Sequence, residues 1–387
     1  MSGSSPEDPF GGIPFLGDLA KMLSSQSGGG WEAARQFAVQ VATGGEPEDN
    51  PDPIERIALQ ELGRVAELHV GDATGLDVAQ TGRPLSIVPV TRAEWARRTI
   101  DAWRPLLEKL SASLTGPALA QGIELDDDDP QAAMFGPLLA ALGPMMLGIQ
   151  AGSMVGHLAS RSLGQYDLPI PRPASDELVM IARNVAEFGD EWSLPRDDLR
   201  LWLCLSDVTT HAVIGVPHVR DRMWSLIEHH VSSFAIDMSS IEEAFADIDP
   251  MDPNALQEAL GDPTALLGSI QSEAKKALLP ELSALVAVVV GYVDHIMDTV
   301  GESLIGSYGM LTEALHRRRV EAAAADTFVD NLLGMSVGSE QYERGEEFVR
   351  GVLERGGDIN RLFMAARDLP TPNEVDAPGL WLARIDL

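Results

Sequence analysis

Cysteine and basic residues are scarce in this chain of 387 residues. The single cysteine, Cys204, excludes a disulfide within one chain. Only 28 Lys and Arg residues accompany 59 Asp and Glu residues, which gives a formal net charge of −31. That charge opposes binding to nucleic-acid phosphates or anionic membranes through bulk electrostatics. The composition therefore predicts no nucleic-acid partner, and it leaves the identity of a protein partner and the oligomeric state open.

Targeting and membrane signals are also weak. The first residues contain neither a basic n-region nor an apolar h-region, and with the lone cysteine this favours a cytoplasmic location. The stretch from Pro130 to Ser160 has no Asp, Glu, Lys or Arg and is long enough to cross a bilayer. Two Gly-Pro pairs, ending at Pro137 and Pro144, would break it into shorter helices. We therefore expect a buried helical hairpin and no membrane span.

Helical periodicity dominates what remains. Residues 54–70 carry apolar side chains at i, i+3 and i+4 spacing, and Thr91 with Glu94 has the spacing of a capping box. Residues 276–300 are apolar nearly all round, which predicts a helix in the centre of the core. Residues 85–90 form the best strand candidate. The sequence thus predicts a mainly α fold, a multi-helix bundle with little or no β structure.

Further helices are predicted at 176–188, 195–214 and 217–234, and the Pro-containing tail from Leu369 is expected to be extended. The glycines at 148, 152 and 156 are spaced to let two helices approach closely.

Composition suggests a short leader followed by one large domain. Residues 1–52 are rich in Gly and Pro and are expected to be a loosely packed leader with one short helix that begins at Trp31. Residues 53–387 are expected to form one helical domain. The acidic linker at 122–130 marks a sub-boundary within that domain.

The candidate site lies in the predicted helix 195–214. Asp207 and His211 are four residues apart, which places a carboxylate and an imidazole on one helix face. The same spacing arises in an ordinary hydrogen-bonded Asp–His pair, so it has low specificity alone. The cluster Arg317, Arg318 and Arg319 is expected to be a solvated helix end.

Several sequence blocks carry a family resemblance: LGQYDLPIP at 163–171, VPHVRDRM at 216–223, VDHIMD at 293–298 and LPTPNEVDAPGLWLAR at 369–384. In this order they resemble a bacterial family of mostly helical proteins described as zincin-like metallopeptidases or hydrolases. One branch of that family is labelled as associated with deazaflavin-coenzyme biosynthesis. The resemblance spans nearly the whole chain and implies a zincin-like helical domain.

The resemblance also implies a degenerate site. Family members with an intact site read H-E-x-T-H on the first site helix and E-G-H on a later one. If His211 is aligned with the second histidine, Asp207 takes the place of the first. If the preceding WLCL is aligned instead, Ser206 and Thr210 take the places of the histidines and Asp207 that of the glutamate. Val290, Gly291 and Tyr292 stand at E-G-H, so Tyr292 is the expected third ligand in either register.

A catalytic zinc requires three protein ligands and a separate general base, and this chain lacks the full set. The leading hypothesis is therefore a zincin-like protein that has lost peptidase activity, holds no cofactor and serves as an interaction or structural protein. The alternative is a metal-dependent hydrolase in which zinc or another divalent metal binds Asp207, His211 and Tyr292, with Asp207 as the candidate catalytic residue. A third hypothesis is a small-ligand site between the two helices, using Tyr292 and His295.

Overall fold

The computed structural model describes residues 29–120, 148–233, 273–325, 333–335 and 337–386. Their regular secondary structure is helical apart from one two-stranded sheet, which confirms the mainly α prediction. The longer helices of the first half are α2 (Gly29–Thr43), α3 (Pro53–Thr74), α4 (Arg92–Ala120), α6 (Ala182–Glu191), α7 (Arg196–Gly215) and α8 (Pro217–Ser232). The second half contains α12 (Glu273–Ile296), α13 (Glu302–Leu304), α14 (Tyr308–Ala325), α16 (Ser339–Glu354), α17 (Pro372–Asp376) and α18 (Pro378–Ile385).

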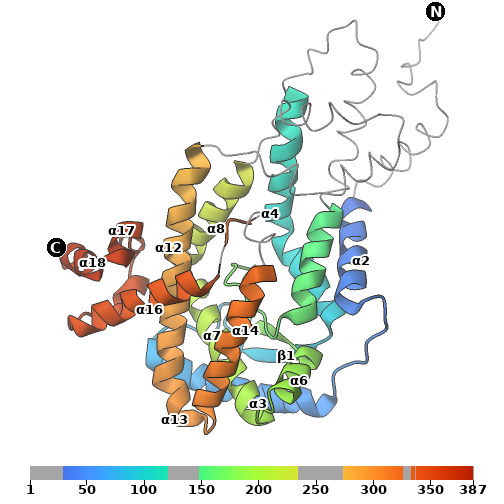
Figure 1. Ribbon diagram of the computed structural model, residues 1–387, viewed down its shortest axis with the longest axis horizontal. Helices are drawn as coiled ribbons and strands as arrows, with labels where there is room; N and C mark the ends of the chain where they lie inside the picture. The colour runs from blue at the N-terminus through green and yellow to red at the C-terminus, as the bar shows by residue number, and fades with distance from the viewer. Residues whose placement is uncertain (1–28, 121–147, 234–272, 326–332, 336, 387) are drawn as a thin grey trace, which may run out of the picture.

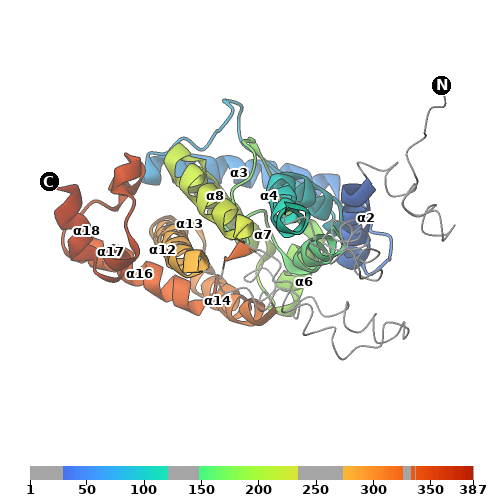
Figure 2. The ribbon, with the colours of Figure 1, turned by 90° about the horizontal axis from the view of Figure 1, so that it is seen from above.

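The helices form one elongated body. In Figure 1, α12, α8 and α4 stand upright beside one another, while α3 lies across their lower ends. Figure 2 places α2 and the α16–α18 group at opposite ends of the molecule. The apolar helix α12 packs against α16, α8 and α7, as its sequence predicts for a central helix. Its chain continues through a π-helical turn, Met297–Gly301, into α13.

The sheet pairs β1 (Ser86–Val90) with β2 (Glu177–Ile181) in parallel. The strand predicted at 85–90 is confirmed, whereas the prediction of a helix from residue 176 is wrong for its first turns. The carboxylate of Asp176 accepts the backbone N–H of Thr81 at 2.8 Å and that of Arg83 at 2.9 Å, which fixes the entry to the sheet. The helix, α6, begins only at Ala182.

The glycine series makes the close helix approach that was predicted. A Cβ atom on Gly152 would lie 2.5 Å from the carbonyl oxygen of Ala34, and one on Gly156 would lie 2.8 Å from that of Ala38. These glycines belong to a helical segment at 148–161, which therefore packs directly on α2. Helix α2 buries Ala34, Ala38 and Ala42, so this part of the expected leader is closely packed rather than loose. Residues 1–28 and the linker 122–130 lie outside the described residues.

The carboxyl-terminal tail is helical, so the prediction of an extended tail is wrong. A capping box between Thr371 and Glu374 starts α17 despite the neighbouring prolines, which are compatible with a first helical turn. The side chain of Trp381 in α18 is fully buried, and its indole N–H donates to the carbonyl of Asp368 at 2.6 Å. The tail therefore packs as part of the fold.

By length and composition alone, the described residues include one helix that could cross a membrane, Leu278–Leu304, and a second if the bent pair α7 and α8 is counted as one span. In the first helix, 67% of the most apolar window is buried inside the protein, as expected for a core helix.

Candidate functional site

Helix α7 carries the predicted site residues in the interior of the fold. It begins after Pro195, with Asp197 and Asp198 in its first turn, where acidic side chains favour the helix dipole. Its second half is almost entirely buried, including Asp207 and His211. Both of these side chains contact the same short stretch of chain, residues 163–167, which we call the anchored loop.

Asp207 binds the backbone of the anchored loop. One carboxylate oxygen accepts the N–H of Gln165 at 2.8 Å, and the other accepts the N–H of Tyr166 at 3.2 Å. Gly164 makes this approach feasible, because a Cβ atom there would lie only 2.2 Å from Oδ2 of Asp207. Burial raises the pKa of Asp207 to about 7, while the two N–H donors act in the opposite direction.

His211 contacts a side chain of the same loop, that of Tyr166. Its Nδ1 lies 3.0 Å from the hydroxyl of Tyr166, and its backbone carbonyl accepts the amide of Gln80 at 3.1 Å. Burial lowers the pKa of His211 to about 4, so the imidazole is neutral at physiological pH. The Tyr166 hydroxyl and Nδ1 of this neutral ring share a hydrogen bond. The Asp207–His211 pair therefore acts as a two-point clamp on the anchored loop.

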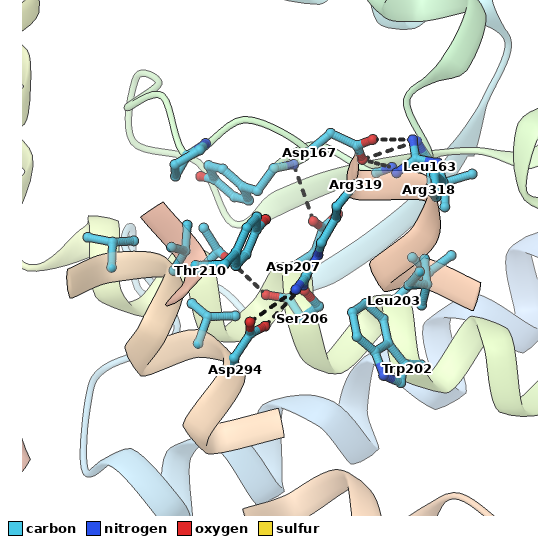
Figure 3. A pocket seen from close by; sticks show the side chains of 18 residues that line it. Leu163, Asp167, Trp202, Leu203, Ser206, Asp207, Thr210, Asp294, Arg318 and Arg319 are labelled. Atoms are coloured by element: carbon cyan, nitrogen blue, oxygen red, sulfur yellow. Dashed lines mark hydrogen bonds and ion pairs between the residues drawn. The ribbon is translucent and has the colours of Figure 1, made fainter. Parts of the chain in front are cut away.

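A pocket of about 80 Å³ lies beside the clamp, between α7, α12, α14 and α16. Figure 3 shows the side chains around it. Helix α7 contributes Ser206, Asp207 and Thr210, and α12 contributes Val290, Val293 and Asp294. The remaining polar wall comes from Asp167 and Tyr166 of the anchored loop, from Arg318 and Arg319 of α14 and from Tyr342 of α16. His211 does not line the pocket, although Asp207 does.

Two ion pairs form the rim of this pocket. Arg319 donates to both oxygens of Asp294 at 3.0 Å, and its guanidinium stacks 4.2 Å from the ring centre of Tyr342. Arg318 donates to Asp167 at 2.5 Å (Figure 3). The expectation of a solvated helix end is therefore wrong for these two arginines. The third, Arg317, does lie on the exposed side, where it pairs with Glu313.

Tyr292 lies away from this pocket. Its hydroxyl donates to Oδ1 of Asn360 at 2.6 Å, and its ring packs edge-on against Phe363. His295, also on α12, is likewise absent from the pocket lining. Asp207 and His211 thus share Tyr166 as a partner, whereas Tyr292 binds a different part of the chain. Among the described residues, no three His, Cys, Asp or Glu side chains gather where they could hold a metal ion.

Comparisons with known proteins assign the chain to a family. Residues 30–382 match the family model of the zincin-like metallopeptidases. The chain belongs to the zincin-like metallopeptidase family. Its fold is similar to a crystal structure from Chloroflexus aurantiacus described as "a putative hydrolase with a novel fold", with a TM-score of 0.62 and 24% sequence identity over 92% of this chain and 98% of the other. No curated protein matches the chain.

The residues that line the pocket correspond to one of the two registers of the zincin motif. Ser206, Asp207 and Thr210 all line it, as expected if they occupy the H, E and final H of H-E-x-T-H. Both registers place a threonine at the threonine of the motif, Thr209 in this register and Thr210 in the other. On α12 the pocket is lined by Val290, at the first position of E-G-H, and not by Tyr292, the expected third ligand.

These side chains do not fit zinc. Structural and catalytic zinc sites take thiolate, imidazole and carboxylate ligands. The ligand positions here hold two hydroxyl groups and a valine, and the hydroxyl of Thr210 donates to the carbonyl of Ser206 at 2.9 Å. The carboxylate at the general-base position, Asp207, has both oxygens bonded to backbone N–H groups. Neither the ligand set nor a free base is present at these positions.

Proposed function

We propose that this member of the zincin-like metallopeptidase family has lost peptidase activity and acts as a binding protein, with the former catalytic pocket as its binding site. The observation that supports the proposal most strongly is the identity of the pocket-lining residues. Ser206, Thr210 and Val290 replace three potential metal ligands, and Asp207 is engaged in the clamp on the anchored loop.

A general base must reach the proton of an attacking water, within about 2.6–3.2 Å or through one further water. In this chain the carboxylate oxygens face the backbone of Gln165 and Tyr166 instead. The pocket itself is retained, with two arginines and several hydroxyl groups along its wall. A retained polar pocket without a catalytic set favours binding over hydrolysis.

The proposal is tested by rebuilding the ligand set. The triple variant Ser206→His/Thr210→His/Val290→Glu places two imidazoles and a carboxylate at the pocket-lining positions. We expect wild-type protein to neither hydrolyse a mixed peptide library nor gain thermal stability with zinc, whereas the triple variant binds one zinc ion per chain.

A matched control is Ser225→His, which pairs a new imidazole with His229 on the surface of α8 at the same helical spacing. This control shows how much zinc a histidine pair on the surface binds, for comparison with the zinc bound by the triple variant in the pocket. Zinc-dependent peptide hydrolysis by the wild-type protein that disappears in Asp207→Asn would refute the proposal. It would support instead a metal-dependent hydrolase with a non-standard site.

A further inference from the structure

The hydrogen-bond acceptors of the pocket are already used. Both oxygens of Asp207 accept backbone N–H groups, and both oxygens of Asp294 accept from Arg319. In Asp167, Oδ1 accepts the N–H groups of Leu163 and Gly164 at 3.1 Å each, and Oδ2 accepts from Arg318. The three carboxylates therefore offer little to a cationic ligand.

The donors of the pocket are not fully used. Arg318 bonds its partners only through Nη2, and Arg319 bonds Asp294 through its two terminal nitrogens, which leaves its Nε. Among the described residues, the hydroxyls of Ser206 and Tyr342 have no hydrogen-bond partner, although both residues line the pocket. A ligand that satisfies these groups must supply acceptor oxygens.

Further positive charge lies near the pocket. Arg161 interacts electrostatically with Asp167 and Arg318, and Arg172 with Asp207, so two further cations lie near the pocket. The lining itself holds three aspartates and two arginines, and Arg161 and Arg172 add positive charge from outside it, in a chain whose net charge is −31. Repulsion of an anion by distant acidic residues is screened beyond about 8 Å at physiological salt. The sign of the ligand therefore follows from the hydrogen-bond donors of Arg318 and Arg319 that are left unused, which require acceptor oxygens.

Part of the pocket wall is aliphatic and the space is small. Val289, Val290, Val293 and Leu315 line it, and the cavity measures about 80 Å³. One water molecule needs about 10–15 Å³ of cavity volume, so this cavity has room for only a few waters. A nucleotide is too large for it. We infer, on the basis of the proposed function, that the pocket binds a carboxylate carrying a short aliphatic group. Such a group occurs at the C-terminus of a peptide and in a free short-chain acid.

Three probes test the inference with the full-length protein. N-acetylvaline represents a peptide C-terminus, N-acetylvalinamide is its uncharged counterpart, and 3-methylbutanoate is a free acid without a peptide group. We expect calorimetry to detect N-acetylvaline binding, with the amide about tenfold weaker or worse, as expected when hydrogen bonds to a charged group are lost. If N-acetylvaline and 3-methylbutanoate bind with equal affinity, a free short-chain acid is sufficient as the ligand. If N-acetylvaline binds more tightly, the ligand is the C-terminus of a peptide.

The paired variant Arg319→Gln/Asp294→Asn removes the guanidinium without leaving a buried carboxylate unpaired. We expect it to weaken N-acetylvaline binding about tenfold or more while the unfolding midpoint shows a folded protein. The control is Arg317→Gln, on the exposed side of the same helix, which should bind as the wild type does. Should the paired variant not fold, Ser206→Leu, which fills the pocket from α7, replaces it with the same expected loss.

Binding of the amide as tight as that of the acid, undiminished binding by the folded pocket variant, or no binding of either acid at millimolar concentration would each overturn the inference. The last result would leave the proposed function standing if zinc and hydrolysis are also absent. Zinc-dependent hydrolysis would refute the proposed function whatever the carboxylates do, so the two failures are distinguishable.

Discussion

The variant Gly164→Ala tests the clamp on the anchored loop most sharply. The added methyl group would lie 2.2 Å from Oδ2 and 2.9 Å from Oδ1 of Asp207, so the carboxylate and the loop must separate. At a pH above 7, where Asp207 is ionised, separation breaks the two N–H bonds to a charged acceptor, each of which contributes about 1.5–3 kcal/mol. Because partial relaxation recovers some of this energy, we expect a loss of about 3 kcal/mol in the free energy of unfolding, measured by urea denaturation.

A double-mutant cycle isolates the contact. Asp207→Ala removes the atoms that clash, so Gly164→Ala should cost far less in that background, with a coupling energy of about 2 kcal/mol. The control is Gly71→Ala, at a helical position where a Cβ would meet no atom within 4 Å. There we expect a gain of about 0.5–1 kcal/mol from the better helix former.

If Asp207 were a free catalytic or metal-binding group in the open pocket, its side chain could move away from a methyl group at small cost. A Gly164→Ala variant as stable as the wild type, or a cycle without coupling, would therefore refute the clamp.

Two further predictions follow from the same contacts. The lowered pKa of His211 contributes stability that is lost as pH falls from 6.5 to about 4, and the raised pKa of Asp207 contributes stability that is lost as pH rises from 3.8 to about 7. As pH falls from 6.5 to about 4, His211→Gln should therefore gain stability relative to the wild type. As pH falls from about 7 to 3.8, Asp207→Asn should lose stability relative to the wild type. Free energies of unfolding from urea denaturation that depend on pH in the same way in all three proteins would contradict this. Tyr292→Phe should cost about 1 kcal/mol, the value of the hydrogen bond to Asn360, and leave ligand binding unchanged in calorimetry; weakened binding would place Tyr292 at the site after all.

Much of the fold follows from local sequence. The amphipathic stripe of α3, the apolar centre of α12 and the capping box at Thr91 each predicted an element that the structure contains. Strand β2 was missed because its five residues, ELVMI, run without a break into a helical pattern, and only pairing with β1 reveals them as a strand. The helices of the tail were not predicted because proline usually interrupts a helix. Here the prolines lie in the first turns of α17 and α18, where proline is compatible with a helix.

Of the residues proposed from the sequence for the site, Asp207 lines the pocket, whereas His211 and Tyr292 do not. The zincin resemblance identified α7 and α12, but two registers fitted the letters equally well, and only the pocket lining separates Thr210 from His211. The roles of Arg318 and Arg319 depend on how α14 packs against segments far away in sequence, so no local pattern reports them. The cytoplasmic location and the absence of a nucleic-acid partner stay predictions.

The central claim, that this zincin-family pocket holds no zinc, is tested most directly by the metal content of protein purified without a histidine tag from zinc-supplemented cells. Mass spectrometry of the digested protein should find far less than one zinc ion per chain. One zinc ion per chain that is lost in Asp207→Asn, but kept in Asp197→Asn on the exposed first turn of the same helix, would contradict the account.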